Sequence, residues 1–327
     1  MKKIYGNEYL IGTLNNMRKN NRLAQSVIFY GERGCGKKLF ADYYTSLLLC
    51  QSPTENGPCG KCTACRILST SSHPDVIYVP TEGKLEGYTV KTARAVSSDV
   101  CIKPNNNTGK KIYIFRDCHN MTVQAQNALL KLIEEPPEYA CFIFTAEAKS
   151  EFLPTIISRC VCFGVSVCTE EEAEASLLES GFTAEETAEA VSRFHGNIGR
   201  CETYIRNENL RGQVDLTNRI ANSIIRKDEY ELNAAFFSVG NNRNDILEIL
   251  SMIDKLARDA AVLSRDSSAG TIGCFREAAE TLSRMLTIYQ AMNIHNAIER
   301  GCRAIEANVN GAFVLAGVCA EIMEIVA

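Results

Sequence analysis

The chain has 327 residues, of which 46% are hydrophobic and 23% are charged. This length predicts two or three domains, and the composition excludes a chain that is disordered, collagenous or coiled coil throughout. The net charge of −4 argues against a polycationic nucleic-acid binder. The charge is uneven, because residues 1–38 carry a net +6 whereas residues 166–191 hold eight glutamates and no Lys or Arg. Such asymmetry indicates either separate partner surfaces or solvated helix faces.

The sequence predicts neither a membrane anchor nor a signal peptide. No uninterrupted apolar run approaches 18 residues, and Met1 is followed by two lysines and a polar segment. The 15 cysteines are odd in number and scattered, unlike the dense pattern of a small secreted scaffold. We therefore expect a protein of the reducing cytoplasm.

Helical patterns and short apolar runs alternate over the first 165 residues. A helical spacing over 8–24 precedes an apolar run at 27–30, and similar runs rich in β-branched and aromatic residues follow at 76–79, 112–115, 141–144 and 161–163. The segments 38–50, 90–100 and 123–134 between them have helical character. This alternation predicts a parallel α/β sheet covered on both faces.

The first apolar run continues into a glycine-rich loop that matches the P-loop pattern through its lysine. Its candidate nucleotide-binding residues are Gly31, Gly34, Gly36, Lys37 and Lys38. Glycines let backbone N–H groups converge on phosphate oxygens, and Lys37 is placed to reach the β and γ phosphates. Lys38, however, stands where Ser or Thr would offer a hydroxyl to Mg²⁺. The loop therefore either holds ATP or ADP without productive hydrolysis, or keeps its shape without nucleotide.

Four cysteines form a metal-ligand pattern that begins at the end of the helical segment 38–50. Cys50, Cys59, Cys62 and Cys65 have the spacing Cys-x8-Cys-x2-Cys-x2-Cys, within a segment that carries Gly57, Pro58 and Gly60. Four thiolates match the tetrahedral coordination of structural zinc. An iron–sulfur cluster uses similar spacing and stays open as an alternative. We expect a zinc-binding loop inserted at 50–65.

Later strand ends supply further candidate residues. Asp117 follows the run 112–115, where an NTPase would hold Mg²⁺, but the next residue is Cys118 and not a glutamate that could activate water. Thr145 is either a γ-phosphate sensor or an ordinary strand-ending hydroxyl. Ser158 and Arg159 precede the last run, where an arginine is placed to reach a neighbouring molecule's nucleotide.

After residue 165 the pattern becomes helical. Two capping boxes, Thr169-x-x-Glu172 and Thr183-x-x-Glu186, open short helices. Residues 207–212 have the composition of a linker, helical stripes occupy 246–260, and 266–270 form a loop. We expect three parts: 1–165, 166–208 and 209–327.

In this order, the segments resemble the clamp-loader branch of the AAA+ family. The resemblance rests on the P-loop and on five further motifs, which are Cys50 with Cys59-Gly60-Lys61-Cys62-Thr63-Ala64-Cys65, His73-Pro74-Asp75, Asn127-Ala128-Leu129-Leu130-Lys131 leading into Glu134-Glu135-Pro136-Pro137, Ser158-Arg159-Cys160, and Gly196-Asn197-Ile198-Gly199-Arg200. The quotable motifs cover residues 1 to about 205. For the helical remainder the likeness is one of length and class.

This resemblance implies an α/β AAA+ P-loop domain, a small helical lid and an all-α C-terminal collar that joins subunits. It implies that Arg159 acts in trans on a neighbour's ATP and that Arg200 faces the nucleotide pocket. It also implies partners: gamma or tau and delta subunits of DNA polymerase III, the sliding clamp, and primed DNA contacted through its backbone. Lys38 and Cys118 depart from the motor subunits and favour a stator that is neither an ATPase nor a polymerase on its own.

Two other functions remain open on the sequence alone. One is an ATP-hydrolysing motor subunit of the same fold, which Lys38 and Cys118 disfavour. The other is a zinc-dependent nucleic-acid-binding module in which the P-loop is a relic, which the net charge of −4 disfavours.

Overall fold

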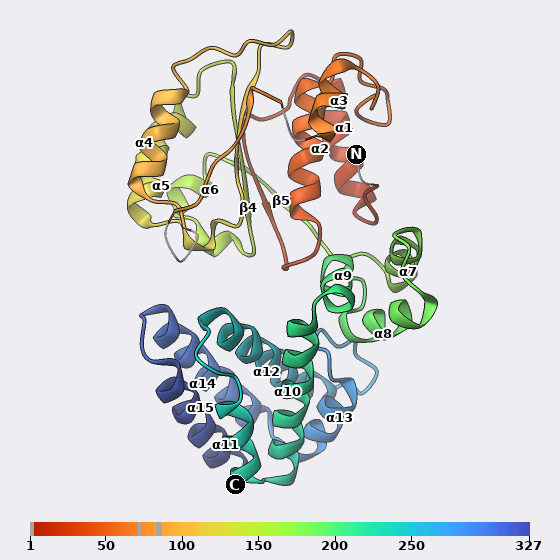
Figure 1. The fold of residues 1–327 in the computed structure, drawn as a ribbon, viewed down its shortest axis with the longest axis vertical. Coiled ribbons are helices and arrows are strands. Elements are labelled where there is room, and N and C mark those ends of the chain that lie inside the picture. The colour runs from red at the N-terminus through yellow and green to blue at the C-terminus, as the bar shows by residue number, and fades with distance from the viewer. Residues whose placement is uncertain (1–2, 71–72, 83–86) are drawn as a thin grey trace. The chain divides into compact units, whose positions relative to one another are not determined.

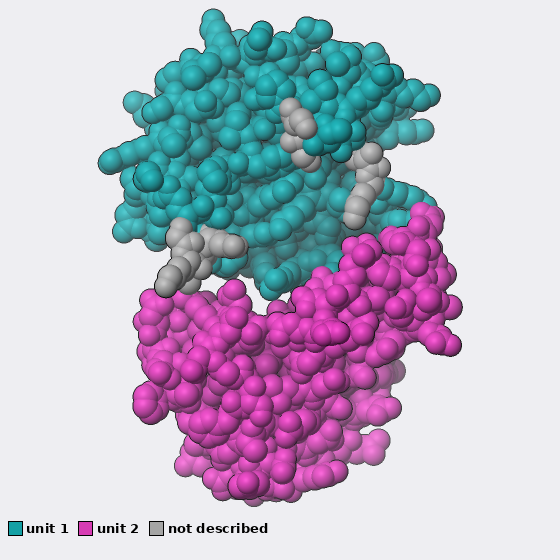
Figure 2. All heavy atoms as spheres, in the orientation of Figure 1, with its two compact units in different colours: residues 1–173, 197–199 teal, residues 174–196, 200–327 magenta. Residues whose placement is uncertain are grey.

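The computed structural model describes residues 3–70, 73–82 and 87–327, which form two compact units (Figure 2). The first unit is Met1–Ala173 with Asn197–Gly199, and the second is Glu174–Gly196 with Arg200–Ala327. The division into three parts expected from the sequence stays a prediction.

The first unit is built on a parallel sheet with the strand order β2-β3-β4-β1-β5. Its strands are β1 (Ser26–Tyr30), β2 (Val76–Tyr78), β3 (Lys111–Phe115), β4 (Ala140–Ala146) and β5 (Val161–Gly164). Val27 of the interior strand β1 pairs with Ile143 of β4 on one side and with Val161 of the edge strand β5 on the other. The five apolar runs therefore form the strands that the sequence predicts, and the P-loop follows an interior strand.

Alternate residues of each strand enter two separate cores, one on each face of the sheet. Ile28, Tyr113 and Phe142 pack against one set of helices, whereas Val27 and Ile112 pack against the other. The helices of the first face are α4 (Val90–Asp99), α5 (Val123–Glu134) and α6 (Pro154–Ile157). Those of the second face are α1 (Glu8–Lys19), α2 (Lys37–Leu49) and α3 (Thr63–Ser69) (Figure 1). Because both faces are covered, the strands are mostly apolar, as the sequence pattern predicts, and Thr145 of β4 is a buried polar exception.

The second unit is helical in the part of the chain that the structure describes. Its longest helices, α10, α12, α14 and α15, lie against one another, and α11 and α13 complete the group (Figure 1). The helices that follow the sheet are α7 (Glu170–Glu179), α8 (Ala184–Phe194), α9 (Ile198–Arg206), α10 (Glu208–Arg226), α11 (Glu229–Phe237), α12 (Arg243–Leu263), α13 (Arg276–Met285), α14 (Ile288–Glu306) and α15 (Gly311–Val326). Short 3-10 turns occupy Cys118–Asn120 and Lys149–Glu151. Among the described helices, none has both the length and the apolar character needed to cross a bilayer.

Both capping boxes form. The Thr169 hydroxyl accepts from the Glu172 N–H while the Glu172 carboxylate accepts from the Thr169 N–H, and Thr183 and Glu186 repeat the arrangement. The loop at 266–270 also lies outside any helix. These local signals are readable because they depend on side chains only three residues apart.

Two boundaries expected from the sequence are wrong. The segment 207–212 is not a linker, since Asn207 caps α10 by accepting from the Asn209 N–H, and Leu210 is buried. Its polar composition belongs to the exposed face of an amphipathic helix. The first helix ends at Lys19 and not at residue 24, because Asn21 adopts a positive φ of 53°.

A core substitution tests the packing between β1 and the edge strand β5. Phe29 is fully buried and stacks on Phe163 at 5.4 Å between ring centroids. We expect Phe29→Ala to lower the free energy of unfolding by about 3–5 kcal/mol, because it removes aromatic contacts and leaves a cavity. Equilibrium urea unfolding measures the change. Tyr9→Ala, at a side chain that is 89% exposed, is the matched control and should shift the value by less than about 0.5 kcal/mol. Equal effects of the two substitutions would contradict the packing described.

Candidate nucleotide and metal sites

The P-loop joins β1 to the start of α2, as the sequence predicts. Gly36 precedes the helix with φ 98°, a left-handed conformation that favours glycine. Asn197 and Gly199, which belong to the same compact unit, contact the loop: Asn197 Nδ2 donates to Arg33 O at 2.9 Å, and the Gly199 N–H donates to Gly34 O at 3.1 Å. A Cβ at Gly199 would lie 2.5 Å from Gly34 O, so only glycine permits this approach.

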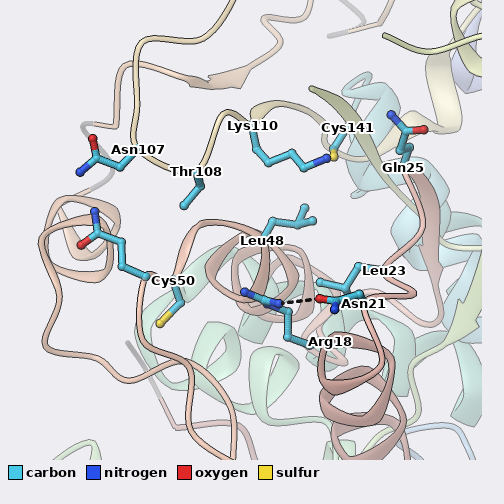
Figure 3. A pocket seen from close by; sticks show the side chains of 11 residues that line it. Arg18, Asn21, Leu23, Gln25, Leu48, Cys50, Asn107, Thr108, Lys110 and Cys141 are labelled. Carbon is cyan, nitrogen blue, oxygen red and sulfur yellow. Dashed lines mark hydrogen bonds between the residues drawn. The ribbon is translucent and has the colours of Figure 1, made fainter. Parts of the chain in front are cut away.

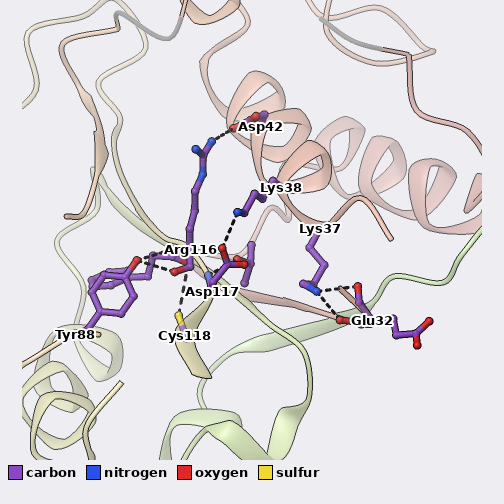
Figure 4. Close-up of polar contacts among 11 residues, drawn as sticks. Glu32, Lys37, Lys38, Asp42, Tyr88, Arg116, Asp117 and Cys118 are labelled. Carbon is purple, nitrogen blue, oxygen red and sulfur yellow. Dashed lines mark hydrogen bonds and ion pairs between the residues drawn. The ribbon is translucent and has the colours of Figure 1, made fainter. Parts of the chain in front are cut away.

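Lys37 is turned toward its own loop. Its ammonium donates to Gly31 O at 2.6 Å and to Glu32 O at 2.9 Å, and the side chain is buried (Figure 4). Both contacts are with main-chain carbonyls, so the lysine holds the curvature of the loop in this arrangement.

Lys38 forms an ion pair with Asp117. Both residues stand at positions that an NTPase would use to bind Mg²⁺. Lys38 Nζ lies 2.6 Å from Asp117 Oδ2 (Figure 4). An ammonium group is only a donor, so it supplies no metal ligand, and its charge neutralises the carboxylate that would. Binding Mg²⁺ here would require the pair to open and two cations to approach each other. These residues therefore do not fit a hydrolytic Mg²⁺ site.

Asp117 is held in an unusual backbone conformation by a buried hydroxyl. Its φ is 53°, and its N–H donates to Thr145 Oγ1 at 2.9 Å. Thr145 is fully buried in β4. Aspartate tolerates the left-handed region better than most residues do. The hydrogen bond shows that Thr145 positions the end of β3, whereas its role as a phosphate sensor stays a prediction.

Cys118 has no basic character in this environment. Its side chain is fully buried, and its Sγ lies 3.6 Å from Phe115 O. Burial raises the pKa of the Cys118 thiol well above its usual range. A protonated, buried thiol cannot take a proton from water at neutral pH.

A charged cluster beside this site was not found by sequence reasoning. Arg116 Nη2 lies 3.3 Å from Asp42 Oδ1, and the guanidinium stacks 4.2 Å from the Tyr78 ring centroid. The Tyr88 hydroxyl bonds to both the N–H and the C=O of Arg116. Burial raises the pKa of the Asp42 carboxyl. In the sequence, the one sign of this cluster is the position of Asp42, which lies four residues after Lys38 on α2.

Arg200 is engaged within the second unit. Its guanidinium pairs with Glu248 of α12 and lies 5.0 Å from the Phe194 ring centroid. Both partners come from the helical region. Its contact with nucleotide therefore stays a prediction.

Arg159 lies between α6 and the edge strand β5. Its guanidinium pairs with Glu134, the last residue of α5, and also donates to Thr155 O at 2.9 Å and to Ser158 Oγ at 3.2 Å. The side chain is 36% exposed. Three acceptors therefore hold an arginine that solvent reaches, and no sequence pattern predicted that Glu134 would be one of them.

The four predicted cysteines converge. The sulfur atoms of Cys50, Cys59, Cys62 and Cys65 all lie within 4.8 Å of one another. Tetrahedral zinc with Zn–S bonds of about 2.3 Å separates its sulfurs by roughly 3.8 Å, so the donor set fits this metal. The Lys61 and Cys62 N–H groups donate to the Cys59 sulfur. These bonds hold the pKa of the Cys59 thiol below its usual value, which favours the thiolate that a metal binds.

Comparison with known proteins identifies relatives of this chain. Residues 6–168 match the family described as DNA polymerase III, delta subunit. The chain is 35% identical over 138 residues to the DNA polymerase III subunit delta' of Pseudomonas aeruginosa, and the alignment covers 42% of each protein. It is 32% identical over 168 residues to the subunit tau of Bacillus subtilis, covering 51% of this chain and 29% of that one. The matched region therefore spans less than half the length of these relatives.

The parallel P-loop sheet, the helical C-terminal region and these matches together define an AAA+ clamp-loader fold. Residues 6–168 belong to the DNA polymerase III clamp-loader subunit family, whose relatives are named delta', gamma and tau. Among solved structures, a gamma subunit-related protein of Thermotoga maritima aligns over 95% of this chain and 98% of its own, at 18% identity and a TM-score of 0.46.

Replacing one cysteine tests the metal site. We expect the protein to carry about one zinc ion per four-cysteine site, and Cys62→Ser to lose that ion because three thiolates bind zinc more weakly. Elemental analysis of the purified protein measures the metal. Cys101→Ser, at an exposed cysteine outside the cluster, should retain full zinc. Zinc content unchanged in the Cys62 variant, or iron in place of zinc, would contradict the prediction.

A second substitution tests the Lys38–Asp117 pair. Lys38→Thr restores a hydroxyl and frees the Asp117 carboxylate, so we expect Mg²⁺ to strengthen nucleotide binding about tenfold, or ~1.4 kcal/mol. The unchanged chain should show no such Mg²⁺ dependence. Titration with a fluorescent ATP analogue, with and without Mg²⁺, measures the effect. Mg²⁺-dependent binding by the unchanged chain would show that the ion pair does not block the metal.

Proposed function

We propose that this chain is the stator, a delta-prime-like subunit, of a cytoplasmic DNA polymerase III clamp loader. In this role it supplies Arg159 to the ATP site of a neighbouring gamma or tau subunit. The complex would use ATP to load the sliding clamp onto primed DNA, together with a delta subunit. The chain itself would neither hydrolyse ATP nor polymerise DNA.

The position of Arg159 relative to the sheet is the observation that carries this proposal. The P-loop follows Tyr30, at the carboxyl end of β1, whereas Arg159 precedes Val161, at the amino end of β5. Val27 pairs with Val161 and Tyr30 with Gly164 in parallel register. The arginine and the P-loop therefore lie at opposite ends of adjacent strands. A phosphate that meets Arg159 is expected to belong to another subunit.

The chain's own nucleotide site supports the same assignment. The Lys38–Asp117 ion pair occupies the place of a metal, and Cys118 is a buried thiol with a raised pKa. A motor needs both the metal and a base or water-positioning group. Two missing parts at one site favour the stator over the motor.

The contacts of Arg159 would allow its guanidinium to exchange Glu134 for a phosphate. An exposed Arg–Glu pair is worth about 0.2–1 kcal/mol, so a phosphate can displace Glu134 at small cost. The planar guanidinium then binds the phosphate oxygens with two parallel hydrogen bonds. Ser158 contributes by accepting from the guanidinium and so limiting its rotamers.

The alternative is an ATP-hydrolysing motor of the gamma or tau type. The match to the tau subunit of Bacillus subtilis, over 51% of this chain, supports this alternative. The motor and the stator differ in one measurable property, which is ATP turnover by the isolated chain.

Substitution of Arg159 tests the stator role. In a clamp loader reconstituted with clamp and primed DNA, we expect Arg159→Ala to slow hydrolysis at the neighbouring site by roughly 10³-fold, because the transition-state charge loses its guanidinium. Steady-state ATP turnover measures the loss. Arg94→Ala, at an exposed arginine of α4, is the matched control and should leave turnover unchanged.

The isolated chain should show no turnover in either variant or in the unchanged form. Turnover by the isolated chain would identify a motor subunit. Unchanged turnover by the complex that contains the Arg159 variant would reject the stator role.

A further inference from the structure

A second polar site lies in the first unit, in a cavity of about 690 Å³ that neither the P-loop nor the cysteine cluster explains. The cavity lies among the end of α1, the end of α2, the loop before β3 and the start of β4 (Figure 3). Its size falls within the range of small-ligand sites. We call it the Arg18 cavity.

The Arg18 cavity has a positive lining. Arg18 and Lys110 line it, and no Asp or Glu is among the described residues that do. Asn21, Gln51, Asn107 and Thr108 add neutral donors. In a chain with a net charge of −4, this is a local region where anions are favoured.

Both cations are held in place by main-chain carbonyls. Arg18 Nε donates to Leu47 O at 2.9 Å, and Nη1 reaches Asn21 Oδ1 at 3.5 Å, which leaves Nη2 without a hydrogen-bond partner among the described residues. Lys110 Nζ donates to Glu138 O at 2.7 Å, which uses one of its three protons. Because these side chains are already ordered, a ligand would lose less conformational entropy on binding them.

The loop that carries Thr108 and Lys110 is also ordered. The Asn106 side chain donates to Asp75 Oδ2 and to Lys110 O, each at 2.7 Å. Its oxygen accepts from the N–H and the hydroxyl of Thr108. Asp75 is buried and also accepts from the Asn105 N–H. This network fixes one wall of the cavity.

We propose that the Arg18 cavity binds the phosphodiester backbone of a nucleic-acid strand. Arg, Lys, Thr, Asn and Gln are among the side chains that contact phosphate oxygens in nucleic-acid complexes, and all five types line this cavity. None of the described residues that line it is aromatic, so these residues offer no ring on which a base could stack. The site therefore recognises backbone without sequence preference. This inference does not depend on the stator role.

Binding of a short labelled oligothymidine to the full chain, followed by fluorescence anisotropy over a range of salt concentrations, tests the proposal. Arg18→Gln and Lys110→Gln each remove one cation. We expect each to weaken binding several-fold and to reduce the slope of log affinity against log salt by about 0.7. Lys91→Gln, at a lysine of α4 whose side chain is 86% exposed, is the matched control and should change neither quantity.

Two further measurements separate the possible outcomes. Thermal melting identifies a variant that has lost its fold; if Arg18→Gln does so, Lys110→Gln carries the test because its ammonium contacts a single carbonyl. Competition with inorganic phosphate should displace the oligonucleotide, whereas polyglutamate of equal charge should not. Full binding by both cavity variants, an equal loss in the Lys91 variant, or equal displacement by polyglutamate would each overturn the proposal. The last result would indicate an acidic peptide as the ligand.

Discussion

The parallel direction of β1 and β5 is the constraint on which the functional geometry depends. Main-chain hydrogen bonds set these two strands in register, from Val27 with Val161 to Tyr30 with Gly164. The P-loop and Arg159 consequently emerge from opposite ends of the sheet. This separation does not depend on side-chain rotamers, because it follows from strand direction. A single domain of this topology carries a P-loop at one end and Arg159 at the other, and the proposed action on a neighbouring subunit rests on this separation.

In the P-loop region of this chain, an internal ion pair stands where an NTPase would bind Mg²⁺. Lys38 places a positive charge at the Asp117 carboxylate, while the Thr145 hydroxyl accepts a hydrogen bond from the Asp117 N–H. Lys37 binds two carbonyls of its own loop. Each contact satisfies a charge or a main-chain group within the protein. The shape of the loop is thus held by the contacts of Lys37 with the loop's own carbonyls and by contacts with Asp117, Asn197 and Gly199.

The inserted cysteine loop and the Arg18 cavity share a boundary. Cys50 directly follows α2, belongs to the converging sulfur cluster, and lines the cavity together with Arg18. Arg18 in turn donates to Leu47 O on the same helix. A metal at the cysteines would therefore order the end of α2 and, through it, one wall of the cavity. The two sites are linked by packing although they would bind ligands of opposite charge.

The sequence by itself determined the features that local chemistry controls. Apolar runs of strand length located all five strands, glycine spacing located the P-loop, and cysteine spacing located the sulfur cluster. The capping boxes were also readable, since their partners lie three residues apart. The same local reading failed at 207–212, where polar residues on the exposed face of α10 have the composition of a linker.

Only the tertiary structure decided which charges meet. Lys38 and Asp117 are far apart in the chain and are brought together by the order of the strands. Asn197 likewise reaches the carbonyl of Arg33 across 164 residues, from the turn before α9. Glu134 and Arg159 meet because the last residue of α5 lies close to the residues that follow α6. No periodicity or motif encodes such pairs, because an ion pair depends on distance in space and not on spacing along the chain.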